Sequence, residues 1–309
     1  MGKKRKTSIL AIANQKGGVA KTTSVVQLAD CFASMGNKVL VVDFDFQGNA
    51  TDWFGLAEKA EKLKKTTAHA IMGSLKFTDI KMKTEIENVD LVASDLSLNY
   101  LMRSLSGSQK QFKVAELILD CEELDNYDLV IIDTHPAVDS VFESVMNFAH
   151  YYLIPIYAEK HPYKGVEYLL RVISEIKEYS NNNLFSLGIF ITNFDKSATA
   201  KEYKKKLEAL CIKNSDRKSK KSRNKERKMV LLDTTIRHSK TVKGASSSSQ
   251  PMSLYTTRQN NIWDDYMALA MEIDSELIGK RTGRPQPAVN SATIKQADDF
   301  VNEFGGYSI

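Results

Sequence analysis

A glycine- and lysine-rich segment, residues 14–23, constrains the fold of this chain more than any other feature. It reads Asn-Gln-Lys-Gly-Gly-Val-Ala-Lys-Thr-Thr, follows the apolar run from Ile9 to Ala13 and precedes a helical pattern. This order predicts a strand, a glycine loop and the start of a helix. Such a loop gathers backbone N–H groups around an anion, and the positive end of the helix dipole adds to that field. We therefore expect a phosphate group as its ligand.

The residue types in this loop fit a nucleotide. Glycine lets the backbone close on phosphate oxygens without a Cβ in the way. Lys21 is placed to reach the β and γ phosphates, and the Thr22 hydroxyl to ligate Mg²⁺. The predicted nucleotide-binding residues of the loop are Gly17, Gly18, Val19, Ala20, Lys21, Thr22 and Thr23. The alternative is a glycine turn whose lysines face solvent, and two further strands argue against it.

Both of these strands end in carboxylates. Residues 38–45 form an apolar run that ends in Asp43 and Asp45, and residues 127–133 form another that ends in Asp133. Unbroken apolar runs are typical of central strands in a parallel sheet, whose carboxyl ends face the ligand crevice. Asp133 has the form of a Walker B group, which supports Mg²⁺, often through water. Three strand ends are therefore expected to converge on one metal-phosphate site.

These motifs resemble those of the ParA-type deviant Walker ATPases, which segregate plasmids and chromosomes or position cellular cargo. The similar segments are Lys16-Gly17-Gly18-Val19-Ala20-Lys21-Thr22-Thr23, Val42-Asp43-Phe44-Asp45-Phe46-Gln47-Gly48-Asn49-Ala50-Thr51 and Ile132-Asp133-Thr134-His135-Pro136. The resemblance covers roughly residues 7 to 275. Three residues depart from the family pattern: Ala20 stands where glycine is usual, and Phe46 and His135 each stand where proline is usual.

The resemblance implies a weak, Mg²⁺-dependent ATPase that forms a homodimer around two ATP molecules. Lys21 holds the phosphates within its own subunit, and Lys16 reaches the phosphates of the partner. Asp45 positions the attacking water, and Thr22, Asp45 and Asp133 surround Mg²⁺. Asn193 lies near the adenine, although Asn is also a common turn residue. A ParB-like partner protein stimulates hydrolysis. Asp43 is left open, as a group close to Mg²⁺ or as a structural carboxylate.

The alternation of strands and helices predicts an α/β fold with a doubly wound, mostly parallel sheet and helices on both faces. We expect one P-loop ATPase domain over residues 1–279, with a flexible basic loop inserted near residues 213–228, and a C-terminal tail over residues 280–309. Residues 53–87 are expected to be helical, and residues 235–251 to form a polar connection.

Positive charge is concentrated in one part of the chain. The net charge is +5, but residues 201–243 hold 16 Lys and Arg against 5 Asp and Glu. This asymmetry is typical of a surface that binds a polyanion, and a solvated basic loop without a partner is the alternative. With the resemblance, it predicts nonspecific DNA binding by Arg258, Lys240, Lys243, Arg217, Lys218, Lys220 and Lys221.

Composition bounds the compartment and the other function classes. Three separated cysteines without a CxxC pair indicate a reducing compartment, and neither a signal peptide nor a membrane span is predicted. We expect a cytoplasmic protein that joins the nucleoid when it binds ATP. A membrane-associated division regulator like MinD is the alternative, disfavoured because Asp298, Asp299 and Glu303 make the tail acidic. A redox ATPase like the nitrogenase iron protein would need paired bridging cysteines.

Overall fold

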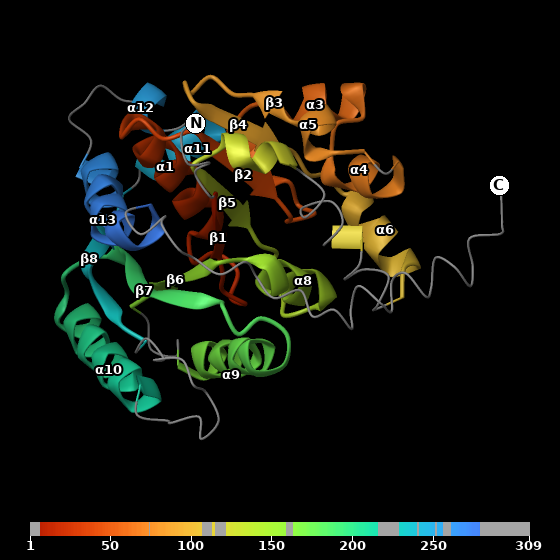
Figure 1. Ribbon diagram of the computed structural model, residues 1–309. Coiled ribbons are helices and arrows are strands. Elements are labelled where there is room, and N and C mark those ends of the chain that lie inside the picture. The colour runs from red at the N-terminus through yellow and green to blue at the C-terminus, as the bar shows by residue number, and fades with distance from the viewer. Residues whose placement is uncertain are drawn as a thin grey trace, which may run out of the picture.

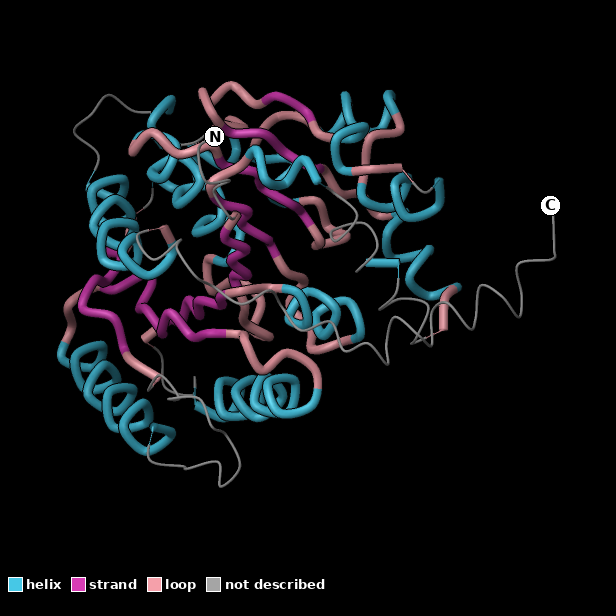
Figure 2. Tube along the Cα trace, in the orientation of Figure 1, coloured by secondary structure: helices cyan, strands magenta, loops and turns pink. Residues whose placement is uncertain are grey.

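The structure is a computed structural model, and it describes residues 7–73, 75–106, 113–114, 122–158, 163–215, 229–239, 241–250, 252–255 and 261–278. Its strands form one sheet in the order β3-β4-β2-β5-β1-β6-β7-β8, which runs through the middle of the molecule (Figure 2). The bounds are Ser8–Ile12 (β1), Val39–Asp43 (β2), Met82–Lys83 (β3), Val89–Val92 (β4), Leu129–Asp133 (β5), Tyr151–Tyr157 (β6), Phe185–Phe194 (β7) and Leu231–Arg237 (β8). Neighbouring strands are parallel except β3, which is antiparallel to β4. The predicted α/β fold is confirmed.

The helices lie on both faces of this sheet. Their bounds are Lys21–Ser34 (α1), Asn49–Trp53 (α2), Ala57–Leu63 (α3), Thr67–Gly73 (α4), Phe77–Ile80 (α5), Ser97–Ser104 (α6), Ser140–Phe148 (α8), Tyr163–Tyr179 (α9), Ala198–Ser215 (α10), Thr241–Ser247 (α11), Met252–Tyr255 (α12) and Asn261–Leu277 (α13). Figure 1 shows α1 and α13 on one face, and α8 and α9 on the other. Each face has its own cluster of buried apolar side chains, so the sheet is covered on both sides.

Burial on both faces explains the composition of the central strands. Every residue of β1, β2 and β5 is buried, and this is the environment in which a strand is apolar throughout rather than alternating. In the register of these strands, Asp133 is opposite Ile12 on one side and opposite Asp43 on the other. The segments that follow β1, β2 and β5 therefore leave the sheet together at the carboxyl ends of these strands. We call this end of the sheet the nucleotide edge.

Two local predictions were wrong. Residues 53–87 are helical only in part, because β3 pairs with β4 at the edge of the sheet. The expected polar connection over residues 235–251 instead contains the end of β8 and helix α11, which is anchored because Ala245 is fully buried. Helix α10 continues to Ser215 and so reaches the first residues of the predicted basic loop near residues 213–228.

The cysteines, the helices and the ends of the described ranges bear on the remaining sequence predictions. Cys31 and Cys211 are buried, and neither forms a disulfide in the described part of the chain. Among the described residues, no helix is both long enough and apolar enough to span a bilayer. Residues 216–228 of the predicted basic loop and the predicted tail, residues 280–309, lie outside the described residues, so the predicted division of the chain stays a prediction.

Candidate functional site

Two buried polar side chains anchor the loop between β1 and α1 to the neighbouring strands. The Asn14 amide donates to the Pro155 carbonyl at 2.7 Å, while its oxygen accepts the Lys16 N–H at 2.9 Å. The Thr192 hydroxyl donates to the Val19 carbonyl at 3.2 Å. The loop is therefore attached to β6 and β7 as well as to β1, and its shape is fixed by the order of the strands.

The backbone of the loop has the conformation that a phosphate-binding loop needs. Gly18 has a φ of 73°, and a Cβ added at Gly17 or Gly18 would have no atom within 4 Å. Open space on this side leaves room for an anion against the backbone. Ala20 has a φ of 67° and caps the N-terminus of α1. A left-handed residue with a Cβ costs about 1–2 kcal/mol, so Ala20 carries strain that glycine would avoid.

Lys21, the first residue of α1, is only 6% exposed. Its ammonium group donates to the Lys16 carbonyl at 3.3 Å, so it is held inside the loop. Burial lowers the pKa of Lys21, and the carboxylates of Asp133 and Asp45 oppose this effect. The Lys21 ammonium is held by the backbone carbonyl of Lys16 and attracted by nearby carboxylates. In this position it is the group expected to bind phosphate oxygens.

Asp43, at the end of β2, has a structural role. Its carboxylate accepts the Thr51 hydroxyl at 2.7 Å, the Thr51 N–H at 3.0 Å and the Asp45 N–H at 3.0 Å. Burial raises the pKa of Asp43, and the nearby Asp133 raises it further. Since these bonds fix the segment that follows β2, the structure favours the structural alternative for Asp43.

Asp133, at the end of β5, is buried and its carboxylate has no direct hydrogen-bond partner among the described residues. Burial raises the pKa of Asp133 to about 7, although the nearby Thr22 hydroxyl and the Lys21 ammonium favour the ionised form. A buried carboxylate without a partner needs an explanation. One beside a threonine hydroxyl fits a hydrated Mg²⁺, which usually binds one or two carboxylates together with water and substrate phosphates.

No cluster of three or more His, Cys, Asp or Glu that could itself hold a metal ion occurs within the described part of the chain. The predicted metal residues, Thr22, Asp45 and Asp133, offer oxygen atoms, which fit Mg²⁺ better than Zn²⁺, since Zn²⁺ sites are built mostly from Cys and His. The predicted metal residues Thr22 and Asp133 interact with each other, and Asp45 acts on the same Lys21.

Asp45 lies in a tight turn after β2 and is 4% exposed. Its carboxylate accepts the Gln47 N–H at 2.9 Å and its carbonyl accepts the Gly48 N–H at 2.8 Å. The preceding residue, Phe44, donates its N–H to the Asp133 carbonyl at 3.0 Å. The structure therefore brings Lys21, Asp45 and Asp133 together at the nucleotide edge, as the sequence predicted. The separate chemical role of each residue stays a prediction.

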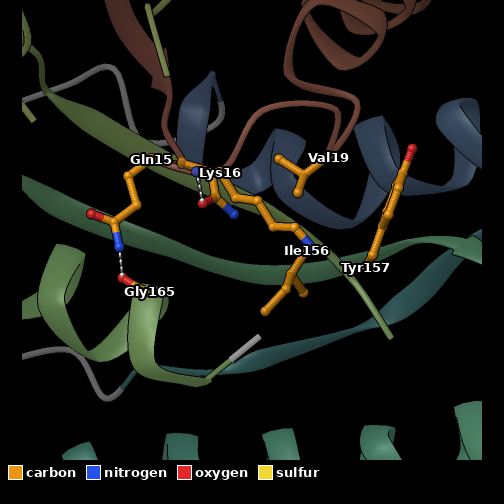
Figure 3. A pocket seen from close by; sticks show the side chains of 7 residues that line it. Gln15, Lys16, Val19, Ile156, Tyr157 and Gly165 are labelled. Atoms are coloured by element: carbon orange, nitrogen blue, oxygen red, sulfur yellow. Dashed lines mark hydrogen bonds between the residues drawn. The ribbon is translucent and has the colours of Figure 1, made fainter. Parts of the chain in front are cut away.

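Lys16 lines a cavity of about 270 Å³. The cavity is lined by Asn14, Gln15, Lys16, Val19, Ile156, Tyr157 and Gly165. Figure 3 shows the exposed Lys16 side chain running toward Ile156 and Tyr157, while the Gln15 amide donates to the Gly165 carbonyl of α9 at 2.8 Å. The Lys16 side chain is exposed, whereas that of Lys21 is buried.

Asn193 lies at the end of β7 and has a φ of 55°. Its side-chain oxygen is hydrogen-bonded to Nδ1 of His238, which follows β8. The structure places Asn193 at the carboxyl end of the sheet, and its contact with a base stays a prediction. The predicted DNA-binding residues Arg217, Lys218, Lys220, Lys221, Lys240 and Arg258 lie outside the described residues, and only the backbone of Lys243 is described, in α11.

Sequence reasoning missed several residues that hold the site together. These are Asn14, Thr51, Thr134, Thr192 and His238. The Thr134 hydroxyl donates to the Ile12 carbonyl at 2.7 Å and joins the ends of β1 and β5. For Thr134 and Thr192, the sequence did offer a signal: each is a threonine within or next to an apolar strand, where a hydroxyl needs a buried hydrogen-bond partner.

Comparisons with known proteins agree with this geometry. A family described as an AAA domain matches residues 7–186. The chain is 31% identical to the sporulation initiation inhibitor protein Soj of Bacillus subtilis over 191 residues, 60% of this chain and 73% of Soj. It is 28% identical to the chromosome partitioning protein ParA of Caulobacter vibrioides over 195 residues, 63% of this chain and 72% of that protein. The chain belongs to the ParA-type partition ATPases of the ParA/MinD superfamily.

Solved structures show that this ParA-type chain shares its fold with nucleotide-bound proteins. Cobyrinic acid a,c-diamide synthase from Mycobacterium smegmatis, with bound ADP and magnesium, has a TM-score of 0.68 at 23% identity, covering 91% of this chain and 100% of that one. A plasmid partition protein from Borrelia burgdorferi bound to AMPPNP has a TM-score of 0.67 at 22% identity, covering 88% and 100%. The cofactors predicted from the sequence, ATP and Mg²⁺, agree with these ligands.

Proposed function

We propose that this ParA-type protein is an ATP-driven dimerisation switch with weak ATPase activity, which binds DNA nonspecifically and drives plasmid or chromosome partition or the positioning of cargo. The observation that carries the proposal is the meeting of Lys21, Asp45 and Asp133 beside an open glycine loop. A buried cation and two buried carboxylates at one sheet edge are costly to the free fold. They are explained if a nucleotide with its metal ion completes the site.

The chemistry of phosphoryl transfer depends mainly on positioning and charge neutralisation. Lys21 binds the β and γ phosphates from inside the loop, and Gly17 and Gly18 let the backbone approach them. Thr22 and, through water, Asp133 would hold Mg²⁺, which neutralises charge on the transferred phosphate. Asp45 orients the attacking water from its fixed turn after β2.

Lys16 supplies the link between ATP and dimerisation in this proposal. Its side chain is exposed and lies at the cavity beside Ile156 and Tyr157, where a second subunit could reach it. A lysine that reaches the partner's phosphates adds positive charge in the way that an arginine finger does. Lys16→Ala should then lose ATP-dependent dimers in light scattering. Dimerisation and phosphate release at normal levels would make Lys16 an ordinary surface lysine.

DNA binding is proposed for the ATP dimer, through Arg258, Lys240, Lys243 and the basic residues 217–221. The excess of positive charge over residues 201–243 supports it. Because two copies of a weak surface act together in a dimer, affinity should rise with ATP and fall when hydrolysis separates the subunits. A ParB-like partner would set the rate of that separation.

The test is DNA retention by the full chain with ATP, with ADP and without nucleotide, across a salt series. The logarithm of the ATP-dependent affinity for DNA should fall linearly with the logarithm of the salt concentration, with a slope of about −0.9 per phosphate neutralised. Arg258→Glu should weaken binding to all sequences alike and reduce the slope, with ATP-dependent dimerisation unchanged. No ATP-dependent retention by the wild type at low salt would reject DNA as the partner, and co-sedimentation with anionic liposomes would then test the MinD-like alternative.

A further inference from the structure

Two residues that depart from the family pattern, Phe46 and His135, contact each other. Their ring centroids are 4.2 Å apart and the rings are inclined at 35°. Phe46 directly follows Asp45 after β2, and His135 follows Asp133 and Thr134 after β5. Both side chains are half-buried, and Phe46 packs against the buried apolar cluster on its face of the sheet. The pair therefore joins the two segments that carry the carboxylates of the site.

The chemistry of the replaced residues suggests why both positions changed. Proline fixes its own φ angle, so a proline in each segment restrains that segment separately. Phe46 and His135 give the backbone no such restraint, but an aromatic pair can supply one through a contact. Two departures that look independent in the sequence are one interaction in the structure.

The contact lies at the right place to act on Asp45. On one side of Asp45, the Phe44 N–H is bonded to the Asp133 carbonyl at 3.0 Å. On the other side, Phe46 is in contact with His135. The two segments are thus connected immediately before and immediately after Asp45.

The position of the His135 ring does not depend on a hydrogen bond from Nδ1. This nitrogen is buried and has no hydrogen-bond partner among the described residues. Packing against Phe46 is the contact that the structure gives to the ring. A phenyl ring at position 135 could therefore take over the same role without the buried polar atom.

We propose that the Phe46–His135 pair positions Asp45 for hydrolysis, by holding the segments after β2 and β5 together as one unit. Both are positioning residues, because they act through Asp45 and not on ATP itself. The inference rests on the proposed ATPase function and adds to it a restraint that belongs to this chain.

The test is a double-mutant cycle of Phe46→Ala, His135→Ala and the double variant, in the full chain at saturating ATP. Aromatic pairs contribute enough in such cycles for about a two- to tenfold effect. Each single variant should lower kcat by about this factor, with the KM for ATP within about twofold of the wild type. The double variant should be no slower than the slower single variant, because the contact is lost only once.

Two further variants separate positioning from general stability. His135→Phe keeps the ring and should restore kcat to near the wild-type value. Phe185→Ala removes a ring contact of similar kind far along the sheet, where the Tyr151 and Phe185 centroids are 6.2 Å apart at 37°. It should lower Tm and leave kcat unchanged.

The inference is overturned if the wild type hydrolyses ATP and the effects of the two alanine variants multiply in the double variant. It is also overturned if the variants lose ATP binding instead of turnover, or if Phe185→Ala slows kcat as much as they do. A wild type that binds but never hydrolyses ATP, alone or with an activating partner, would instead reject the proposed ATPase function and this inference with it.

Discussion

The nucleotide edge and the β8–α13 face, where strand β8 packs against helix α13, both hold charged residues. The two regions differ in how deeply these residues are buried. At the nucleotide edge, Lys21, Asp45 and Asp133 are almost fully buried. On the β8–α13 face, Arg237 is half-exposed and forms a bidentate pair with Asp265, with N–O distances of 2.7 and 2.8 Å. The charged groups of the nucleotide edge are therefore shielded from water, whereas the Arg237–Asp265 pair is partly exposed to it.

The pKa values show what this difference means. At the nucleotide edge, burial lowers the pKa of Lys21 and raises that of Asp133, so each charged form is less favourable than in water. On the β8–α13 face, the hydrogen-bonded Asp265 raises the pKa of Arg237 and favours its charged form. Buried charged groups with unfavourable pKa shifts indicate a functional site. A hydrogen-bonded ion pair at the surface indicates a structural role.

The largest effect should come from Lys21→Ala, which removes the buried cation. Truncating one partner of a buried charge pair costs about 2–5 kcal/mol, so ATP affinity should fall by about 30-fold to several thousandfold, since each factor of ten corresponds to about 1.4 kcal/mol. Titration with a fluorescent ATP analogue measures the loss. Lys206→Ala is the matched control, because Lys206 is an exposed lysine paired with Glu202. Unchanged affinity in Lys21→Ala would reject the nucleotide site itself.

Asp45→Ala should act on turnover instead of binding. Losing the group that orients the water should lower kcat by about 100-fold, while ATP binding and ATP-dependent dimerisation remain. Phosphate release gives the rate, and light scattering gives the dimer. Asp43→Ala offers a contrast, since it removes three hydrogen bonds within the fold and should lower Tm. Normal turnover in Asp45→Ala would make Asp45 a turn-forming carboxylate.

The nucleotide edge was predictable because its functional residues are local in the sequence. Lys21 lies three residues after Gly18, and Asp45 and Asp133 each lie at the end of an apolar run. The side chains that support them were not predictable, because Thr192 reaches Val19 only when β7 lies two strands from β1. The contact between Phe46 and His135 also depends on β2 and β5 being neighbours.

The β8–α13 face was less predictable than the nucleotide edge. Two N–H groups within β8, those of Asp233 and Thr234, donate to the Glu272 carboxylate of α13 at 2.8 and 3.0 Å. Strand β8 also pairs with β7 through irregular register. Neither feature can be recognised from the residues near position 231, so residues 235–251 were predicted as a polar connection, and the end of β8 and helix α11 were missed. Long-range contacts decided both elements.

Asp133→Asn should stabilise the protein when nucleotide and Mg²⁺ are absent. The substitution removes a buried carboxylate that has no direct hydrogen-bond partner among the described residues. The gain in the free energy of unfolding should be on the order of 4 kcal/mol at pH 8, because the pKa of Asp133 lies about three units above its unfolded value, with the attraction of Lys21 included, and each unit corresponds to about 1.4 kcal/mol. Chemical denaturation measures it.

The pH dependence gives this prediction its sign. Folded Asp133 keeps its proton up to about pH 7, whereas the unfolded chain loses it near pH 4. The folded state therefore binds more protons in this window, and stability falls as pH rises from about 4 to about 7. The advantage of Asp133→Asn should grow over the same window and be small at pH 4. The buried Asp43, whose pKa is also raised, leaves a residual slope in both proteins. A variant less stable than the wild type at pH 8 would contradict the prediction.

Arg237→Ala should have the smallest effect, because the side chain of Arg237 is 47% exposed and that of Asp265 is 12% exposed. Surface pairs contribute about 0.2–1 kcal/mol, and the bidentate geometry of this one puts it near the upper end of that range. Chemical denaturation at low salt and at 1 M NaCl should show the difference from the wild type shrinking, since salt screens exposed charges. Glu202→Gln, in the more exposed Lys206 pair of α10, should change stability by less. A loss of several kcal/mol in Arg237→Ala, insensitive to salt, would mean that the β8–α13 face depends on its charges as strongly as the nucleotide edge does.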